Sequence, residues 1–148
     1  MKTAILLQAP AGRIWELLSD FGLYREWNPL FRLGKGRAAA GAEVELTVRL
    51  PSIPPFAIKA KVVRAAPQSA LCWRHVTASP LILRWDYGFE LVQANPGEVR
   101  LVQSSRFGGV LGPLFALALG RSVREGMAEL ERAVARWGEK GNVRCLRC

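Results

Sequence analysis

The sequence predicts a single α+β domain in which a curved antiparallel sheet of about seven strands wraps around a long C-terminal helix, with two short helices after the first strand. Three observations support this prediction. The chain has 148 residues, half of them hydrophobic, which suits one ordinary domain. Period-two alternation runs through its middle, and a helical period of 3.6 appears near each end. Only the C-terminal helix is large enough to cover the apolar face of such a sheet.

The N-terminal segment predicts a short strand followed by two helices. Residues 3–7 form the expected strand, and Pro10 suits a first helical position because the N–H that it lacks would be unpaired there. An apolar helix face follows at i, i+3, i+4 and i+7, formed by Ile14, Leu17, Leu18 and Phe21. Gly22 breaks this helix, and a second short turn carries Tyr24 and Trp27. Pro29 ends that turn, because the residue before a proline is disfavoured in the α region.

Six further strands are predicted from alternation and turn signals. The clearest case is residues 43–50, where apolar and polar residues alternate without interruption. Turn signals, including Asn95-Pro96-Gly97, separate the apolar runs. We expect strands at about 30–37, 43–50, 56–62, 71–76, 84–91 and 99–107. The connections between them are short, so consecutive strands should be antiparallel neighbours.

The helical period returns after Gly112-Pro113. An apolar stripe is formed by Val123, Met127, Leu130, Val134 and Trp137, with arginine and glutamate at most of the remaining positions. A helix over about 113–137 would be roughly 37 Å long at ~1.5 Å per residue. It is long enough to lie across the whole sheet.

Several segments match one known superfamily. They are Ala9-Pro10, residues 14–21, Tyr24 with residues 26–29, residues 71–73, residues 88–91, residues 107–109 before Pro113-Leu114, and Gly126-Met127. Over about residues 1–138 the chain resembles the START-like helix-grip superfamily, also called SRPBCC, in particular its polyketide cyclase/dehydrase and lipid-transport branch. The resemblance implies a START-like ligand-binding domain over 1–140 and a tail over 141–148. It also implies a deep cavity between sheet and long helix for a small apolar or amphipathic molecule, of lipid, polyketide or aromatic type.

The predicted inner face of the sheet mixes aromatic with polar side chains. Buried polar atoms cost about 1–3 kcal/mol each unless they are paired, so a solid core would favour aliphatic residues. Apolar walls with a few polar groups are typical of small-molecule pockets. From the alternation we therefore expect ligand contacts from Trp73, His75, Trp85, Tyr87, Phe89, Gln103, Ser105 and Phe107. The resemblance adds Trp27 and Asn28 at the lip of the cavity, where they could equally lock the turn, and Met127 and Leu130 on its lid side.

His75, the only histidine, and Tyr87 are the candidates for catalysis, but no residue is assigned a catalytic role. The histidine could bind a ligand carbonyl or act as a general acid or base, or it could be a core histidine bonded to a neighbouring strand. The alternation places no carboxylate inward beside it, so proton transfer lacks a visible partner. The sequence therefore favours a cofactor-free carrier over the alternative, a polyketide cyclase/dehydratase-type enzyme.

The formal net charge of +9 raises a second alternative, a basic surface that binds nucleic acid or anionic lipid. Lysines and arginines are spread over the six later predicted strands and the last helix, without a basic run or an exposed aromatic platform, which argues against nucleic acid. The longest uncharged run, residues 107–120, is too short to span a bilayer and is rich in glycine. We expect a cytoplasmic monomer or homodimer without a transmembrane segment.

The three cysteines do not form a recognisable site. Cys145 and Cys148 make a C-x-x-C in which we expect no following helix to lower a thiol pKa. A structural zinc ion needs four ligands, and Cys72 and His75, the other obvious donors, should point to opposite faces of one strand. We expect no metal site and no disulfide framework.

Overall fold

Seven strands form one continuous antiparallel sheet in the order β1-β7-β6-β5-β4-β3-β2. The computed structural model describes residues 1–139, apart from the side chain of Leu33. The strands are β1 (Lys2–Leu7), β2 (Phe31–Lys35), β3 (Glu43–Val48), β4 (Phe56–Ala66), β5 (Ala70–Thr77), β6 (Leu83–Asn95) and β7 (Glu98–Gly108). The first two strands of the chain therefore lie at opposite edges of the sheet.

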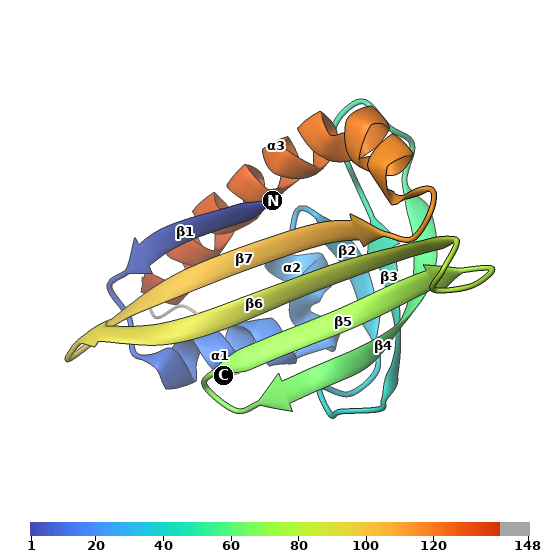
Figure 1. Ribbon diagram of the computed structural model, residues 1–148. Helices are drawn as coiled ribbons and strands as arrows, with labels where there is room; N and C mark the ends of the chain where they lie inside the picture. Colours follow the sequence, from blue (N-terminus) through green and yellow to red (C-terminus); the bar gives the residue numbers. More distant parts are fainter. Residues whose placement is uncertain (140–148) are drawn as a thin grey trace.

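Three short helical segments connect those two edge strands, and one long helix ends the fold. The segments are α1 (Ala11–Ser19), the 3₁₀ turn η1 (Phe21–Leu23) and α2 (Tyr24–Trp27), and the long helix is α3 (Gly112–Glu139). The helix α3 contacts β7 and β1 of the curled sheet, together with α1 and α2 (Figure 1). The predicted fold class, an α+β helix-grip domain, is confirmed. Among residues 1–139 no helix is long and apolar enough to cross a membrane.

Two strands are longer than the alternation predicts. The strand β4 continues to Ala66 beyond an irregularity between Val62 and Arg64, and β6 continues to Asn95. The added part of β6, residues 92–95, is exposed to solvent on both faces. Alternation appears only where one face is buried, so these ends carry no such signal.

The middle of the domain is filled by a cluster of aromatic rings. The Trp73 ring stacks on the Tyr87 ring at a centroid distance of 5.6 Å, and Phe31 from β2 meets both rings edge-on. Phe21 and Phe89 close the cluster around Trp73. Such edge-to-face contacts suit the quadrupoles of the rings. This part of the interior is a packed core, so a ligand cavity must lie elsewhere.

Candidate functional site

Hydrogen bonds within the protein satisfy the polar groups at the centre of the inner sheet face. The Tyr87 hydroxyl donates to Oε1 of Gln103 at 2.5 Å, and Nε2 of Gln103 donates to the carbonyl oxygen of Met127 at 3.0 Å. Burial raises the pKa of Tyr87 well above its ordinary value, with smaller contributions from Tyr24 and Glu131. The phenol is therefore a neutral donor, and the chain of bonds connects β6, β7 and α3.

A second bond joins the same two strands nearer the start of α3. The Trp85 indole Nε1 donates to the Ser105 hydroxyl at 2.8 Å. The Trp85 ring also stacks on Phe107 at a centroid distance of 5.5 Å, and Phe107 in turn lies near Phe115 of α3. This ring ladder separates the packed aromatic cluster from open space beyond it.

The open space is a cavity of about 420 Å³ between this end of the sheet, the loop that follows β3 and the first turns of α3. It is lined by Leu50, Ile53, Phe56, Ala57, Ile58, His75, Thr77, Leu83, Trp85, Phe107, Phe115 and Leu119. Only His75 and Thr77 contribute polar side chains. The cavity is thus an apolar chamber with one polar edge.

The polar edge is organised by His75. Its Nδ1 lies 2.8 Å from the carbonyl oxygen of Lys59 on β4, and its Nε2 lies 3.1 Å from Oγ1 of Thr77. A carbonyl only accepts, so Nδ1 donates to Lys59. The tautomer that carries its proton on Nδ1 accepts from the Thr77 hydroxyl at Nε2. The His75 ring is therefore hydrogen-bonded to a neighbouring strand and also lines the cavity. The sequence left both the core role and the cavity-lining role open, and the structure combines them.

The structure brings His75, Trp85 and Phe107 together in this cavity. The other predicted contact residues lie deeper in the fold. Trp73, Tyr87 and Phe89 belong to the aromatic cluster, Gln103 and Ser105 to the hydrogen-bonded pairs, and Met127 and Leu130 to the fully buried core beneath α3.

The two residues expected at the lip are buried in the turn before β2. Oδ1 of Asn28 accepts from the backbone N–H groups of Leu30 at 3.0 Å and Phe31 at 2.8 Å. The Trp27 ring meets Tyr24 edge-on at 5.5 Å. Asn28 therefore locks the turn in this structure, which is one of the two roles that the sequence predicted for it.

Sequence reasoning missed most of the cavity wall. Phe115 and Leu119 precede Val123 and Met127 at steps of four, so they continue the apolar stripe of the C-terminal helix. This spacing of four residues was the sequence signal that could have placed Phe115 and Leu119 in the cavity wall. Leu50 and Ile53 come from an irregular loop, where no period indicates which way a side chain points.

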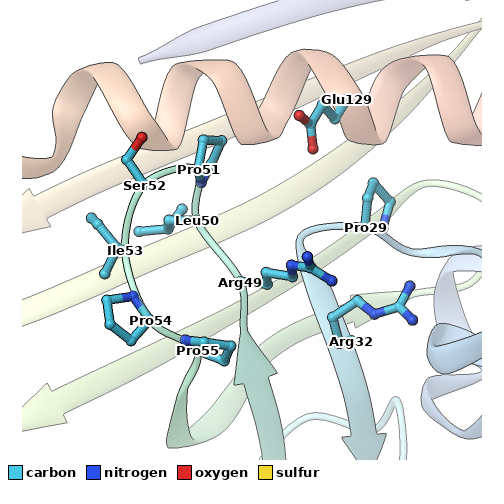
Figure 2. Close-up of a pocket in the computed structure, with 10 residues that line it drawn as sticks. All are labelled: Pro29, Arg32, Arg49, Leu50, Pro51, Ser52, Ile53, Pro54, Pro55 and Glu129. Carbon is cyan, nitrogen blue, oxygen red and sulfur yellow. The ribbon is translucent and has the colours of Figure 1, made fainter.

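A second, larger cavity lies against the same loop, and Figure 2 shows its lining. It has a volume of about 640 Å³ and is lined by Pro29, Arg32, Arg49, Leu50, Pro51, Ser52, Ile53, Pro54, Pro55 and Glu129. Arg32 and Arg49 line this cavity on the side of β2 and β3, and Glu129 lines it from α3 (Figure 2). Charged side chains line part of this cavity, whereas the lining of the first cavity is mainly apolar. The Ser122 hydroxyl donates to the Pro51 carbonyl at 3.0 Å and ties the shared loop to α3.

No metal centre appears in the described part of the chain. Within residues 1–139 no three His, Cys, Asp or Glu side chains are grouped so that they could hold an ion. Cys72 is half-buried, and burial is the main cause that raises the pKa of its thiol. Cys145 and Cys148, and the predicted domain boundary at residue 140, lie outside the described residues.

A curled sheet gripping a long helix, with an apolar cavity at one end, defines a START-like helix-grip domain. The chain belongs to the polyketide cyclase / dehydrase and lipid transport family, whose sequence profile matches residues 1–135. No curated protein shows significant sequence similarity to the chain.

Solved structures with the same fold are distant in sequence. The Zhui aromatase/cyclase from Streptomyces sp. R1128 is 17% identical with a TM-score of 0.73, over 97% of this chain and 94% of that one. A START superfamily protein from Mycobacterium smegmatis is 16% identical with a TM-score of 0.69, over 95% and 97%. A point mutant of norcoclaurine synthase from Thalictrum flavum is 14% identical with a TM-score of 0.70, over 96% and 94%. At these identities the likeness shows the fold alone.

Proposed function

We propose that the protein binds and carries a small hydrophobic or amphipathic ligand, of lipid, polyketide or aromatic type, in the cavity beside Trp85. The observation that supports this most directly is the apolar lining of that cavity, whose volume of about 420 Å³ suits a small molecule. Each methylene group that a ligand buries there contributes about 0.8 kcal/mol. Affinity would come mainly from apolar contact.

The polar edge gives the ligand a preferred orientation. When the Thr77 hydroxyl donates to Nε2 of His75, its oxygen can still accept another hydrogen bond. A ligand hydroxyl would be a suitable donor to that oxygen, with the apolar part of the ligand directed toward Trp85 and Phe115. We therefore favour an amphipathic ligand with one hydrogen-bond donor at its polar end.

Binding is better supported than catalysis by the residues around this cavity. His75 is the only titratable side chain in its lining, and no carboxylate accompanies it. The Tyr87 hydroxyl is bonded to Gln103 within the core rather than directed at the cavity. The cyclase/dehydratase alternative predicts that His75→Ala abolishes turnover of an enolisable substrate without unfolding the protein.

A matched pair of variants on one helix tests the proposed binding. Leu119→Trp would fill the cavity from α3, whereas Leu117→Trp adds the same ring two residues earlier, at an exposed position. Native mass spectrometry and displacement of a fluorescent fatty acid should show binding by the wild type and by Leu117→Trp, and a loss of at least about tenfold for Leu119→Trp. Absence of binding across a broad panel of apolar compounds, or equal binding by both variants, would contradict the proposal.

A further inference from the structure

Large apolar side chains project into solvent around one end of the domain. Leu81, Val110 and Leu117 leave 77%, 81% and 85% of their surfaces exposed, which is unusual for residues of this size. Together with three less exposed neighbours they form what we call the apolar rim: Leu81, Ile82, Val110, Leu111, Leu114 and Leu117. The rim comes from the β5–β6 turn, the β7–α3 turn and the first turns of α3, which meet at one end of the sheet (Figure 1).

The apolar rim is ordered and borders the ligand cavity. The Val110 N–H donates to the Leu81 carbonyl at 2.8 Å, and the Leu111 N–H donates to the Ile82 carbonyl at 2.9 Å, so the two turns form one unit. Leu83 and Phe115, which follow directly in these segments, line the cavity. The exposed side chains of the rim are therefore direct sequence neighbours of residues that line the cavity.

Within the segments that build the apolar rim and the cavity, the charged residues are all basic. The three segments that build the cavity and the rim, residues 50–59, 76–85 and 107–124, contain none of the chain's 12 acidic residues. They contain Lys59, Arg84, Arg121 and Arg124. The nearest acids in sequence are Asp86, which pairs with Arg74 at 2.6 Å and with Arg84 at 3.5 Å, and Glu125, which pairs with Arg121 at 3.4 Å.

We propose that the apolar rim docks on the surface of an anionic lipid bilayer, so that the cavity opens toward the membrane. Apolar side chains flanked by basic ones match such a surface, because the apolar groups enter the acyl boundary while lysine and arginine meet the phosphates. A carrier of apolar molecules would gain a direct path for loading and release. The docking itself does not depend on the identity of the ligand, and it is tested without one.

A second copy of the chain fits this surface less well. In a two-fold contact the same patch meets itself, which would bring the basic residues of both copies together without acidic partners from these segments. An anionic bilayer offers charges of the opposite sign across the whole patch. The charge pattern therefore favours lipid over self-association.

Two double variants with equal charge change separate docking from general electrostatics. Leu114→Glu/Leu117→Glu places acids in the apolar rim. Leu6→Glu/Val92→Glu places them at the opposite end of the sheet, where both side chains are about half exposed and lie opposite Arg100 in the strand register. Each variant of the full chain is mixed with phosphatidylcholine vesicles, with or without about 30 mol% phosphatidylserine, and sedimented.

The proposal predicts binding of the wild type to the phosphatidylserine vesicles, weakened by added salt. Leu114→Glu/Leu117→Glu should bind at least about tenfold more weakly, while Leu6→Glu/Val92→Glu stays within about threefold of the wild type. Thermal unfolding and fatty-acid displacement in solution should be similar for the three proteins, which separates a failure of docking from a failure of ligand binding. No vesicle binding by the wild type, or equal losses in both variants, would overturn the proposal. So would a wild-type dimer that only the rim variant dissociates, because the rim would then be a protein interface.

Discussion

The Tyr87 hydroxyl lies 2.5 Å from Oε1 of Gln103, and Nε2 of the same amide reaches the Met127 carbonyl. This arrangement closes the polar network of the inner sheet face on itself and joins it to α3. The polar groups that suggested a pocket from the sequence are therefore a structural bridge. The open cavity lies further along the same two strands, past the bond from Trp85 to Ser105.

Removing the amide from this bridge should destabilise the fold. Gln103→Leu leaves the Tyr87 hydroxyl and the Met127 carbonyl buried without their partner, so the free energy of unfolding should fall by about 1–3 kcal/mol. Urea denaturation measures the loss, and Gln93→Leu, on an exposed part of β6, is the control. Adding Tyr87→Phe to Gln103→Leu should recover part of the loss. Strictly additive effects of the two substitutions would contradict the bridge.

The two tyrosines should resist ionisation in the folded protein. The pKa of each is raised well above the ordinary value, mainly by burial, and Tyr24 and Tyr87 are the only tyrosines in the chain. An ultraviolet titration should therefore show no tyrosinate at pH 10, where a free tyrosine is about half ionised. Half-ionisation near pH 10 in the folded state would contradict the burial of these phenols.

The same shifts fix the sign of the alkaline stability change. Because the unfolded chain ionises its tyrosines near pH 10 and the folded chain does not, the stabilisation is complete below about pH 10. It is lost as the pH rises from there toward the folded-state pKa values. The urea midpoint of the wild type should fall steadily as the pH rises above 10. The midpoint of Tyr87→Phe, measured relative to its own value at neutral pH, should fall less.

A glycine at the edge strand β2 allows the 3₁₀ turn η1 to pack against the sheet. A Cβ atom on Gly34 would lie 2.5 Å from the backbone carbonyl oxygen of Phe21, and backbone cannot move aside as a side-chain end can. Gly34→Ala should therefore lower the free energy of unfolding by about 2 kcal/mol or more. Gly22→Ala, whose added methyl group meets only the Asp20 carboxylate at 3.4 Å, is the matched control. Equal stabilities of the two variants would contradict this close packing.

Alternation was sufficient to predict the sheet and the helix that covers it. In β3 and the residues just after it, every second residue from Val44 to Leu50 is buried, and the helical stripe from Val123 to Val134 is buried in the same regular way. The period of the hydrophobic pattern indicates which face of a strand or helix is covered. Seven strands joined in sequence by short turns can adopt only a few topologies. The fold class follows from these two facts.

The location of the cavity could not be predicted in the same way. Trp73 on β5 and Trp85 on β6 both face inward, and the alternation in the two strands does not distinguish them. Phe21, Phe31 and Tyr87 nevertheless fill the space around Trp73. Open space remains beside Trp85, between the sheet, the loop after β3 and the first turns of α3. Alternation says that a side chain faces inward, whereas the filling of that space depends on contacts from remote parts of the chain.

The apolar rim escaped sequence reasoning for a related reason. Residues 113–119 are apolar on every side of the helix, so no polar face within this segment marks Leu114 and Leu117 as exposed, even though Phe115 and Leu119 continue the stripe that begins at Val123. A hydrophobic period requires polar residues for contrast. Only the three-dimensional arrangement shows which of these side chains reach solvent.

The most direct test of the central claim is an NMR titration that follows the tryptophan indole N–H resonances while a fluorescent fatty acid is added. The chain has five tryptophans, and only Trp85 lines the apolar cavity. Binding in that cavity predicts a large, saturable shift of the Trp85 indole resonance, with Trp15 and Trp137 unmoved, and loss of the shift in Leu119→Trp. A silent Trp85 resonance under saturating ligand, or shifts confined to the other tryptophans, would contradict the account.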